Sequence, residues 1–229
     1  MISQEYIKDS LDKMADAKYR DFVSAINPYN GKVYGVRLPL LRKFAKEIVK
    51  EGNNVDFLNL PNVDSVEERM LHGFVIGYSG FDFNTLLAYI KGFVSKIDCW
   101  AVCDSCCSTF KGVKKDLPST FSFSLGYLKS DKEFEQRFGL VMLICYFIVD
   151  DYIDRVINEL KQVSVNAYYS KMALAWCVAE CFIKYPEKSL ELVQDMAKDI
   201  DLFRMTKRKI LDSYRVDCRY KDIIRGMQM

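Results

Sequence analysis

Apolar residues recur every three or four positions along most of this chain, which is the period of an α-helix. Residues 3–26 follow this pattern and are predicted to be helical. Residues 27–31 read Asn-Pro-Tyr-Asn-Gly and predict a turn. Pro39 can then open a helix at its first turn, and we expect that helix to run to about Lys50 and to end at Glu51.

From residue 65 onward the predicted helices come in pairs. First helices are expected to begin near residues 65, 98, 131, 168 and 202, at intervals of 33, 33, 37 and 34 residues. Capping signals and helix-opening residues mark several starts: Ser65 with Glu68, Ser130-Asp131 with Glu133, Asp82, Asp150-Asp151, and Pro186. A two-helix unit repeated about every 35 residues is typical of an α-solenoid. An irregular helical bundle is the alternative.

The composition agrees with a chain of long helices. Only 11 glycines and five prolines interrupt 229 residues, and half of the residues are hydrophobic. This length suits one large domain or one repeat array, and we expect a single domain over residues 1–229.

The net charge of +2 is too small to indicate a partner, but basic residues gather near the C-terminus. The range 203–225 holds eight basic residues against three aspartates. A local basic patch suits a nucleic-acid backbone, although a solvated helix face explains it equally well.

The chain begins without the pattern of a signal peptide, and its longest apolar run, residues 138–149, is too short to span a bilayer. We therefore expect a cytoplasmic protein whose eight cysteines are reduced thiols.

The chain has two tryptophans, and both lie in helical patterns. Asp104 follows Trp100 by four residues, so on a helix the indole and the carboxylate share a face. Trp100, Arg137 and Trp176 are spaced 37 and 39 residues apart on successive first helices, and equivalent positions in stacked repeats project from the same side. A lone helical tryptophan usually belongs to a core. An aspartate beside it at the mouth of a cleft is a candidate functional group.

Two other patterns resemble metal-binding motifs, but we assign neither of them to a metal site. Cys99, Cys103 and Cys106 have the spacing of a cysteine motif that holds an iron–sulfur cluster, but they lie in a helical stretch, where thiolates cannot converge on one cluster. His72 is the only histidine, and one histidine cannot build a zinc site. We expect no metal and no cofactor.

Several stretches in this order and spacing resemble the AlkD-like DNA alkylation repair proteins, which are HEAT-like helical-repeat DNA glycosylases. The resemblance covers nearly the whole chain, and the stretches that carry it are residues 35–42, the Trp100-x-x-x-Asp104 element, residues 137–141, residues 168–176 and residues 209–216. It implies an all-α, HEAT-like helical-repeat solenoid, an α-α superhelix with a concave DNA-binding face.

The resemblance also implies the residues of the site. In active members two tryptophans, an aspartate and an arginine form the lesion site, and Trp100, Trp176, Asp104 and Arg137 occupy those positions here. The basic residues expected to contact the DNA backbone are Arg37, Lys171, Arg204, Lys207, Arg208 and Arg215. This chain departs from the pattern at Cys99, where active relatives often carry an aromatic residue.

The expected function is a monomeric DNA glycosylase that excises cationic purines, alkylated at N3 or N7, from duplex DNA. The family also contains DNA binders without glycosylase activity, so a non-catalytic protein that binds branched or distorted DNA is the alternative. A helical-repeat scaffold that binds protein through its concave face is a third hypothesis, which the exposed aromatic residues and the basic C-terminal segment disfavour. The preferred lesion is left open.

Overall fold

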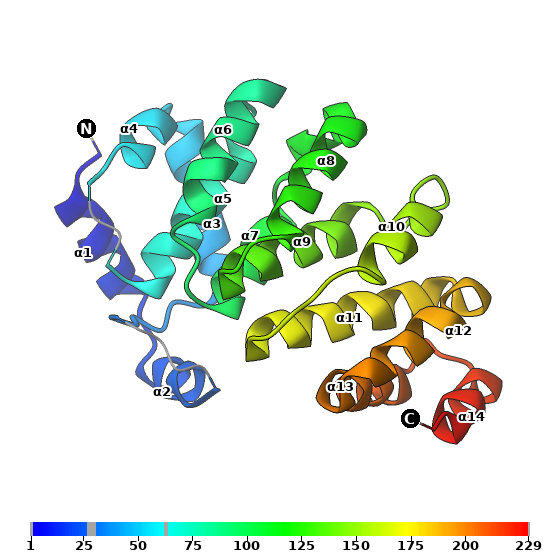
Figure 1. Cartoon of the computed structure of the whole chain (residues 1–229). Helices are drawn as coiled ribbons and strands as arrows, with labels where there is room; N and C mark the ends of the chain where they lie inside the picture. Colours follow the sequence, from blue (N-terminus) through cyan, green and yellow to red (C-terminus); the bar gives the residue numbers. More distant parts are fainter. Residues whose placement is uncertain (1, 27–30, 62–63, 229) are drawn as a thin grey trace. The chain divides into compact units, whose positions relative to one another are not determined.

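The computed structural model describes residues 2–26, 31–61 and 64–228, and within these ranges every regular element is a helix (Figure 1). The predicted all-α fold is therefore confirmed. The chain divides into two compact units, Met1–Leu117 and Pro118–Met229. The turn predicted at residues 27–31 lies outside the described residues except for Gly31.

The first unit is a two-layer stack of helices. One layer is centred on α5 (Val66–Tyr78), which packs between α3 (Leu38–Lys50) and α7 (Trp100–Cys107). The other helices of the unit are α1 (Gln4–Met14), α2 (Ala17–Ile26), α4 (Asn54–Leu58), α6 (Phe83–Val94) and the 3-10 helix η1 (Lys111–Asp116). Because α3, α4, α6 and α7 all contact α5, its residues from Val66 to Ile76 are buried. A helix covered on all sides has no polar face, which is why its hydrophobic pattern is weakly periodic.

The second unit repeats this arrangement. Its first helices are α9 (Glu133–Tyr146), α11 (Tyr168–Lys184) and α13 (Ile200–Asp212), with α11 between the other two (Figure 1). The other helices are α8 (Leu117–Leu128), α10 (Ile153–Leu160), α12 (Pro186–Asp195), η2 (Met196–Lys198) and α14 (Cys218–Gly226). Helices α10 and α12 contact α11 and each other, and α14 contacts α13.

The helical repeat is confirmed by the positions of the first helices. From α5 to α13 they begin at residues 66, 100, 133, 168 and 200, so consecutive starts are 34, 33, 35 and 32 residues apart. Within each unit, neighbouring first helices pack side by side, as stacked repeats require.

Most of the predicted signals at helix ends are present in the structure. Ser65 and Glu68 form the predicted capping box at the start of α5, and the Asp82 side chain caps α6. Pro39 lies in the first turn of α3, which ends at Lys50, and Pro186 opens α12. These signals depend only on neighbouring residues, so the sequence alone can carry them.

Two predicted helix starts, at Ser130-Asp131 and at Asp150-Asp151, are wrong. Helix α10 begins at Ile153, and its N-cap residue, Tyr152, makes no side-chain cap hydrogen bond. The cap at Ser130-Asp131 does not form. The Ser130 hydroxyl donates to Glu135 at 2.8 Å instead, and α9 begins at Glu133. The stretch predicted to be helical, residues 3–26, forms two helices, α1 and α2, because the Asp16 carboxylate accepts a hydrogen bond from the Tyr19 backbone N–H at 3.0 Å and starts a new helix after Met14. Within the described ranges no helix is both long and apolar enough to cross a membrane.

Candidate functional site

Trp100 and Asp104 lie one turn apart on α7, as predicted, and both side chains are half-buried. Cys99 occupies the N-cap position, in extended backbone. The residue before it, Asp98, forms an ion pair with Arg69 on α5, with 3.0 Å between Arg69 Nε and Asp98 Oδ1. This ion pair connects the residues just before α7 to α5, the central helix of the unit. It therefore holds the start of α7, at Trp100, in place.

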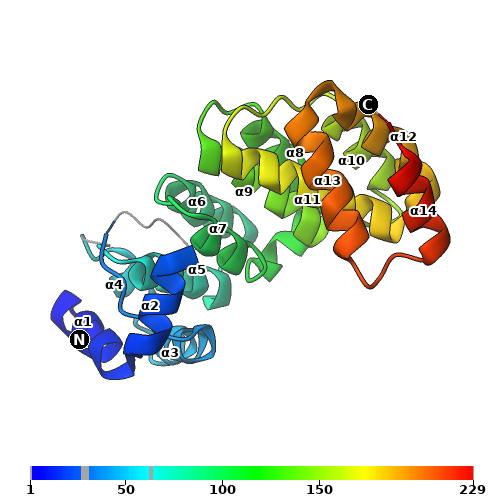
Figure 2. The ribbon, with the colours of Figure 1, turned by 90° about the horizontal axis from the view of Figure 1, so that it is seen from below.

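An apolar cavity of about 120 Å³ lies beside Trp100. Its walls come from α2, α3, α5 and α7, and Figure 2 shows α2 beside α3 and α5. Phe22 and Ile26 of α2 line the cavity although half or more of each side chain is exposed. None of the residues of α2 is buried. Trp100 is therefore bordered on this side by a lightly packed helix.

Glu67 holds the segment before α3 next to this cavity. Its buried carboxylate accepts hydrogen bonds from the backbone N–H groups of Tyr34, Gly35 and Val36, at 3.1, 2.8 and 3.2 Å. Gly35 has a φ of +83°, and a Cβ there would lie 2.5 Å from the Asp16 carbonyl oxygen. The stretch around Gly35 that carries part of the family resemblance thus has a structural role, which is to seat a tight backbone turn on a buried carboxylate.

Arg37 follows that turn and is exposed. Its guanidinium pairs with Asp16 at 3.0 Å and lies over the Tyr19 ring, with 4.8 Å between Arg37 Cζ and the ring centroid. Hydrogen bonds from the Tyr19 backbone and from Arg37 lower the pKa of Asp16. Arg37 is therefore accessible but already has a carboxylate partner.

The cysteines of α7 are packed as apolar residues. Cys103, Cys106 and Cys107 are fully buried, and Cys106 donates a weak hydrogen bond to the Met70 carbonyl at 3.6 Å. Burial raises the pKa of Cys99 to about 12, so this thiol stays protonated at neutral pH and is a poor metal ligand. In the described part of the chain, no group of three His, Cys, Asp or Glu side chains is arranged to hold a metal ion.

Arg137 lies on α9 in the second unit and is almost completely buried, with 4% of its surface exposed. Its Nη1 donates to the Tyr169 carbonyl at 2.8 Å, while the Tyr169 backbone N–H donates to Glu133 at 2.6 Å. Both polar groups of the Tyr169 backbone are thus bonded to α9. These contacts fix the first turn of α11 against α9.

Trp176 lies on α11 and is half-buried. Its indole Nε1 donates to Glu180 Oε1 at 3.1 Å, one turn further along the helix. Arg215, in the turn between α13 and α14, forms a two-pronged ion pair with the same carboxylate, at 2.9 and 2.6 Å. The structure thus brings together two predicted site residues, Trp176 and Arg215, through Glu180, which was not among the predicted site residues. The sequence does contain a pattern that could have indicated Glu180. This carboxylate follows Trp176 by four residues, as Asp104 follows Trp100.

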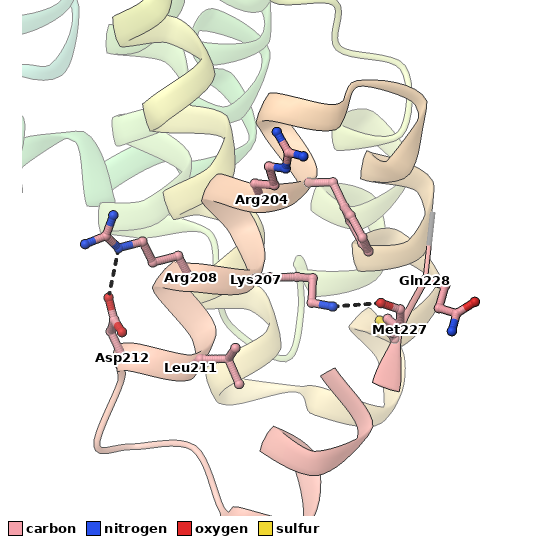
Figure 3. A pocket seen from close by; sticks show the side chains of 8 residues that line it. Arg204, Lys207, Arg208, Leu211, Asp212, Met227 and Gln228 are labelled. Carbon is pink, nitrogen blue, oxygen red and sulfur yellow. Dashed lines mark hydrogen bonds and ion pairs between the residues drawn. The ribbon is translucent and has the colours of Figure 1, made fainter. Parts of the chain in front are cut away.

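Three of the predicted DNA-binding residues lie together on α13, at a groove of about 600 Å³ that the chain after α14 also lines (Figure 3). Arg204 and Arg208 are exposed at this groove, and Arg208 forms a 3.6 Å ion pair with Asp212. The Lys207 ammonium donates to the Met227 carbonyl at 2.7 Å. The rim of the groove is therefore basic. One of its basic residues, Lys207, already donates to a backbone carbonyl of the chain.

Lys171 on α11 is also engaged within the second unit. Its ammonium lies 2.6 Å from the Asp199 carboxylate, which caps the start of α13. This ion pair and the cap hydrogen bonds lower the pKa of Asp199. Lys171 therefore connects two neighbouring first helices.

Comparison with known proteins gives one match. The family model described as "DNA alkylation repair enzyme" matches residues 7–208, which is most of the chain. Searches of curated proteins and of solved structures gave no match. The matched range includes both tryptophans, Asp104 and Arg137, and it continues through Arg208 on α13. The chain belongs to the DNA alkylation repair enzyme family.

Proposed function

We propose that this protein is a DNA glycosylase that removes purines alkylated at N3 or N7 from duplex DNA. One observation carries the proposal: an indole and a carboxylate, Trp100 and Asp104, lie half-buried one turn apart on α7. Membership of a family of DNA alkylation repair enzymes supplies the class of substrate.

The chemistry of the lesion suits this pair of residues. Alkylation at N3 or N7 makes a purine cationic, so the base is already a good leaving group and needs little help from a general acid. The remaining barrier is the positive charge that develops on the deoxyribose as the glycosidic bond breaks. A fixed carboxylate such as Asp104 stabilises that charge and can orient the attacking water.

The tryptophans act as aromatic surfaces beside this charge. An indole face attracts a cation by about 0.5–2 kcal/mol when the pair is partly desolvated. In the proposal Trp100 and Trp176 flank the deoxyribose and the adjacent backbone. Arg137 is assigned to a phosphate, for which a planar guanidinium is well shaped, although in the free protein its guanidinium is buried and donates to the Tyr169 carbonyl.

The six basic residues are proposed to contact the DNA backbone without reading sequence. They are Arg37, Lys171, Arg204, Lys207, Arg208 and Arg215, and such contacts make DNA affinity fall as salt rises. Arg37 and Arg208 are exposed and paired with exposed or half-exposed aspartates. Ion pairs of this kind contribute about 0–1 kcal/mol, so a phosphate can replace the aspartate at small cost.

The decisive experiment is base release from a methylated duplex by the purified protein. The substrate is DNA treated with a methylating agent, the assay separates free 3-methyladenine and 7-methylguanine, and no metal or cofactor is added. Release above that of heat-treated protein supports the proposal. DNA binding that weakens with salt, without any release, would instead support the alternative of a non-catalytic DNA-binding protein on the same scaffold.

A further inference from the structure

Glu180 connects a proposed catalytic residue to a distant turn. Its Oε1 accepts from Trp176 Nε1 at 3.1 Å and from Arg215 Nη2 at 2.6 Å, and its Oε2 accepts from Arg215 Nη1 at 2.9 Å. The Glu180 side chain is 19% exposed, whereas that of Arg215 is 61% exposed. The carboxylate is thus largely enclosed, and both of its oxygens are used.

The geometry limits how the indole can turn. Trp176 has a single polar atom, Nε1, and that atom is bonded to a carboxylate on the same helix face. Any other rotamer breaks a hydrogen bond to a charged acceptor. Rotamer changes of this kind are disfavoured, since hydrogen bonds to charged groups are stronger than those between neutral groups.

The arginine keeps the acceptor in place. A glutamate has three rotatable bonds and would otherwise sample several positions, but the two-pronged contact with Arg215 fixes the plane of the carboxylate. The opposite charge also offsets the cost of enclosing it. The hydrogen bonds that Arg215 donates to Glu180 raise the pKa of Arg215.

We propose that Glu180, held by Arg215, is a positioning residue that fixes the ring of Trp176 in the orientation needed to face the DNA lesion. The inference rests on the proposed glycosylase function. It gives Glu180 no contact with the substrate, and it places the guanidinium of Arg215 on Glu180 in the free protein. The aromatic face of Trp176 is then set before DNA binds.

The hold on the indole can be tested without any activity. Two tryptophans give two indole N–H signals in a proton–nitrogen correlation spectrum, and a Trp100→Phe variant assigns them. Glu180→Ala is expected to shift the Trp176 signal upfield and to speed its exchange with solvent, while the Trp100 signal stays unchanged. Glu180→Gln keeps an acceptor oxygen and should restore most of the shift. An unmoved Trp176 signal in Glu180→Ala overturns the proposal.

Single-turnover base release then tests the consequence for the reaction. Glu180→Ala should lower the rate constant about ten- to a hundredfold, the range that a hydrogen bond to a charged group spans, and should change the Kd for DNA little. Glu180→Gln should recover part of the rate. Asp154→Ala is the matched control, since it removes an ion pair between α10 and Lys188 on α12 that touches neither tryptophan.

The outcomes separate the two proposals. A shifted Trp176 signal with an unchanged rate means that Glu180 is only structural, and this result would overturn the positioning role. A wild-type protein that releases no base overturns the glycosylase proposal and with it the catalytic purpose of Glu180, while the spectrum still decides whether Glu180 holds the indole. If Arg215→Ala leaves the Trp176 signal in place and lowers only DNA affinity, the assignment of Arg215 to Glu180 is wrong.

Discussion

The two tryptophans of this protein are each followed, four residues later, by a carboxylate, yet their surroundings differ. In the second unit, Trp176 is bonded to Glu180, whose charge is balanced by Arg215. In the first unit, Trp100 borders an apolar cavity beside α2. Aspartate is one methylene shorter than glutamate, so Asp104 reaches less far along the helix than Glu180 does.

We propose that the same spacing serves two purposes in this protein. A carboxylate that is bonded to an indole and paired with an arginine has little charge to offer a substrate, so Glu180 is suited to positioning. We assign the electrostatic role to Asp104 alone. The following predictions test that division, beginning with the largest effect.

Asp104→Asn should lower the rate of base release about 10²–10³-fold, because it removes a fixed charge that acts mainly on the transition state. Packing and DNA affinity should change little, since asparagine keeps the shape and the hydrogen-bonding capacity of the side chain. The measurements are single-turnover release, DNA binding and a thermal melt of both proteins. Unchanged release, or a loss of activity that only follows a lower Tm, would remove Asp104 from the catalytic role.

Glu67→Ala should destabilise the first unit by about 3–5 kcal/mol, because it leaves three buried backbone N–H groups without an acceptor. Urea unfolding measures the change. Glu47→Ala is the control in the same unit, because it removes an exposed carboxylate of α3 that pairs with Lys43 and should cost at most about 1 kcal/mol. Equal losses in the two variants would mean that the turn at Gly35 does not depend on the Glu67 carboxylate.

The single histidine should make the first unit sensitive to acid. Burial and the nearby Lys96 ammonium lower the pKa of His72 to about 4, so the folded protein keeps this ring neutral while the unfolded chain protonates near pH 6.5. Stability from this group is complete above pH 6.5 and is lost as the pH falls toward 4, up to about 3 kcal/mol.

Urea unfolding of the wild type and of His72→Gln at pH 7, 5.5 and 4.5 isolates this effect from other titrating groups. The difference between the two proteins should shrink as the pH falls. The Trp100 fluorescence of a Trp176→Phe variant should report the loss, because the histidine belongs to the same unit as Trp100. A difference that does not depend on pH contradicts the prediction.

Arg204→Ala and Arg208→Ala should have the smallest effects. If each side chain contacts one phosphate, each substitution lowers the slope of log K against log salt by about 0.9 and leaves the rate on bound DNA unchanged. Lys188→Ala is the matched control, because this exposed lysine lies on α12 and pairs with Asp154. A slope that falls equally in all three variants would indicate an effect of net charge and not of the groove on α13.

Sequence by itself determined the features that depend on neighbouring residues. The spacing of apolar positions gave the helices and their repeat, and capping residues such as Ser65 and Pro39 gave their starts. The family resemblance, which the matching family model confirms, followed from the order of short motifs. Trp100 and Asp104 could be placed on one face because that relation belongs to a single helix.

Only the tertiary structure decided which polar groups meet across helices. The acceptance of three backbone N–H groups by Glu67 and the contact of Glu180 with Arg215 join residues that are 31 to 35 positions apart. Arg137 was predicted as a phosphate ligand, and the structure places its guanidinium against the Tyr169 carbonyl of the next first helix. Such contacts depend on how whole helices pack, because burial forces each polar group to find a partner wherever the fold places one.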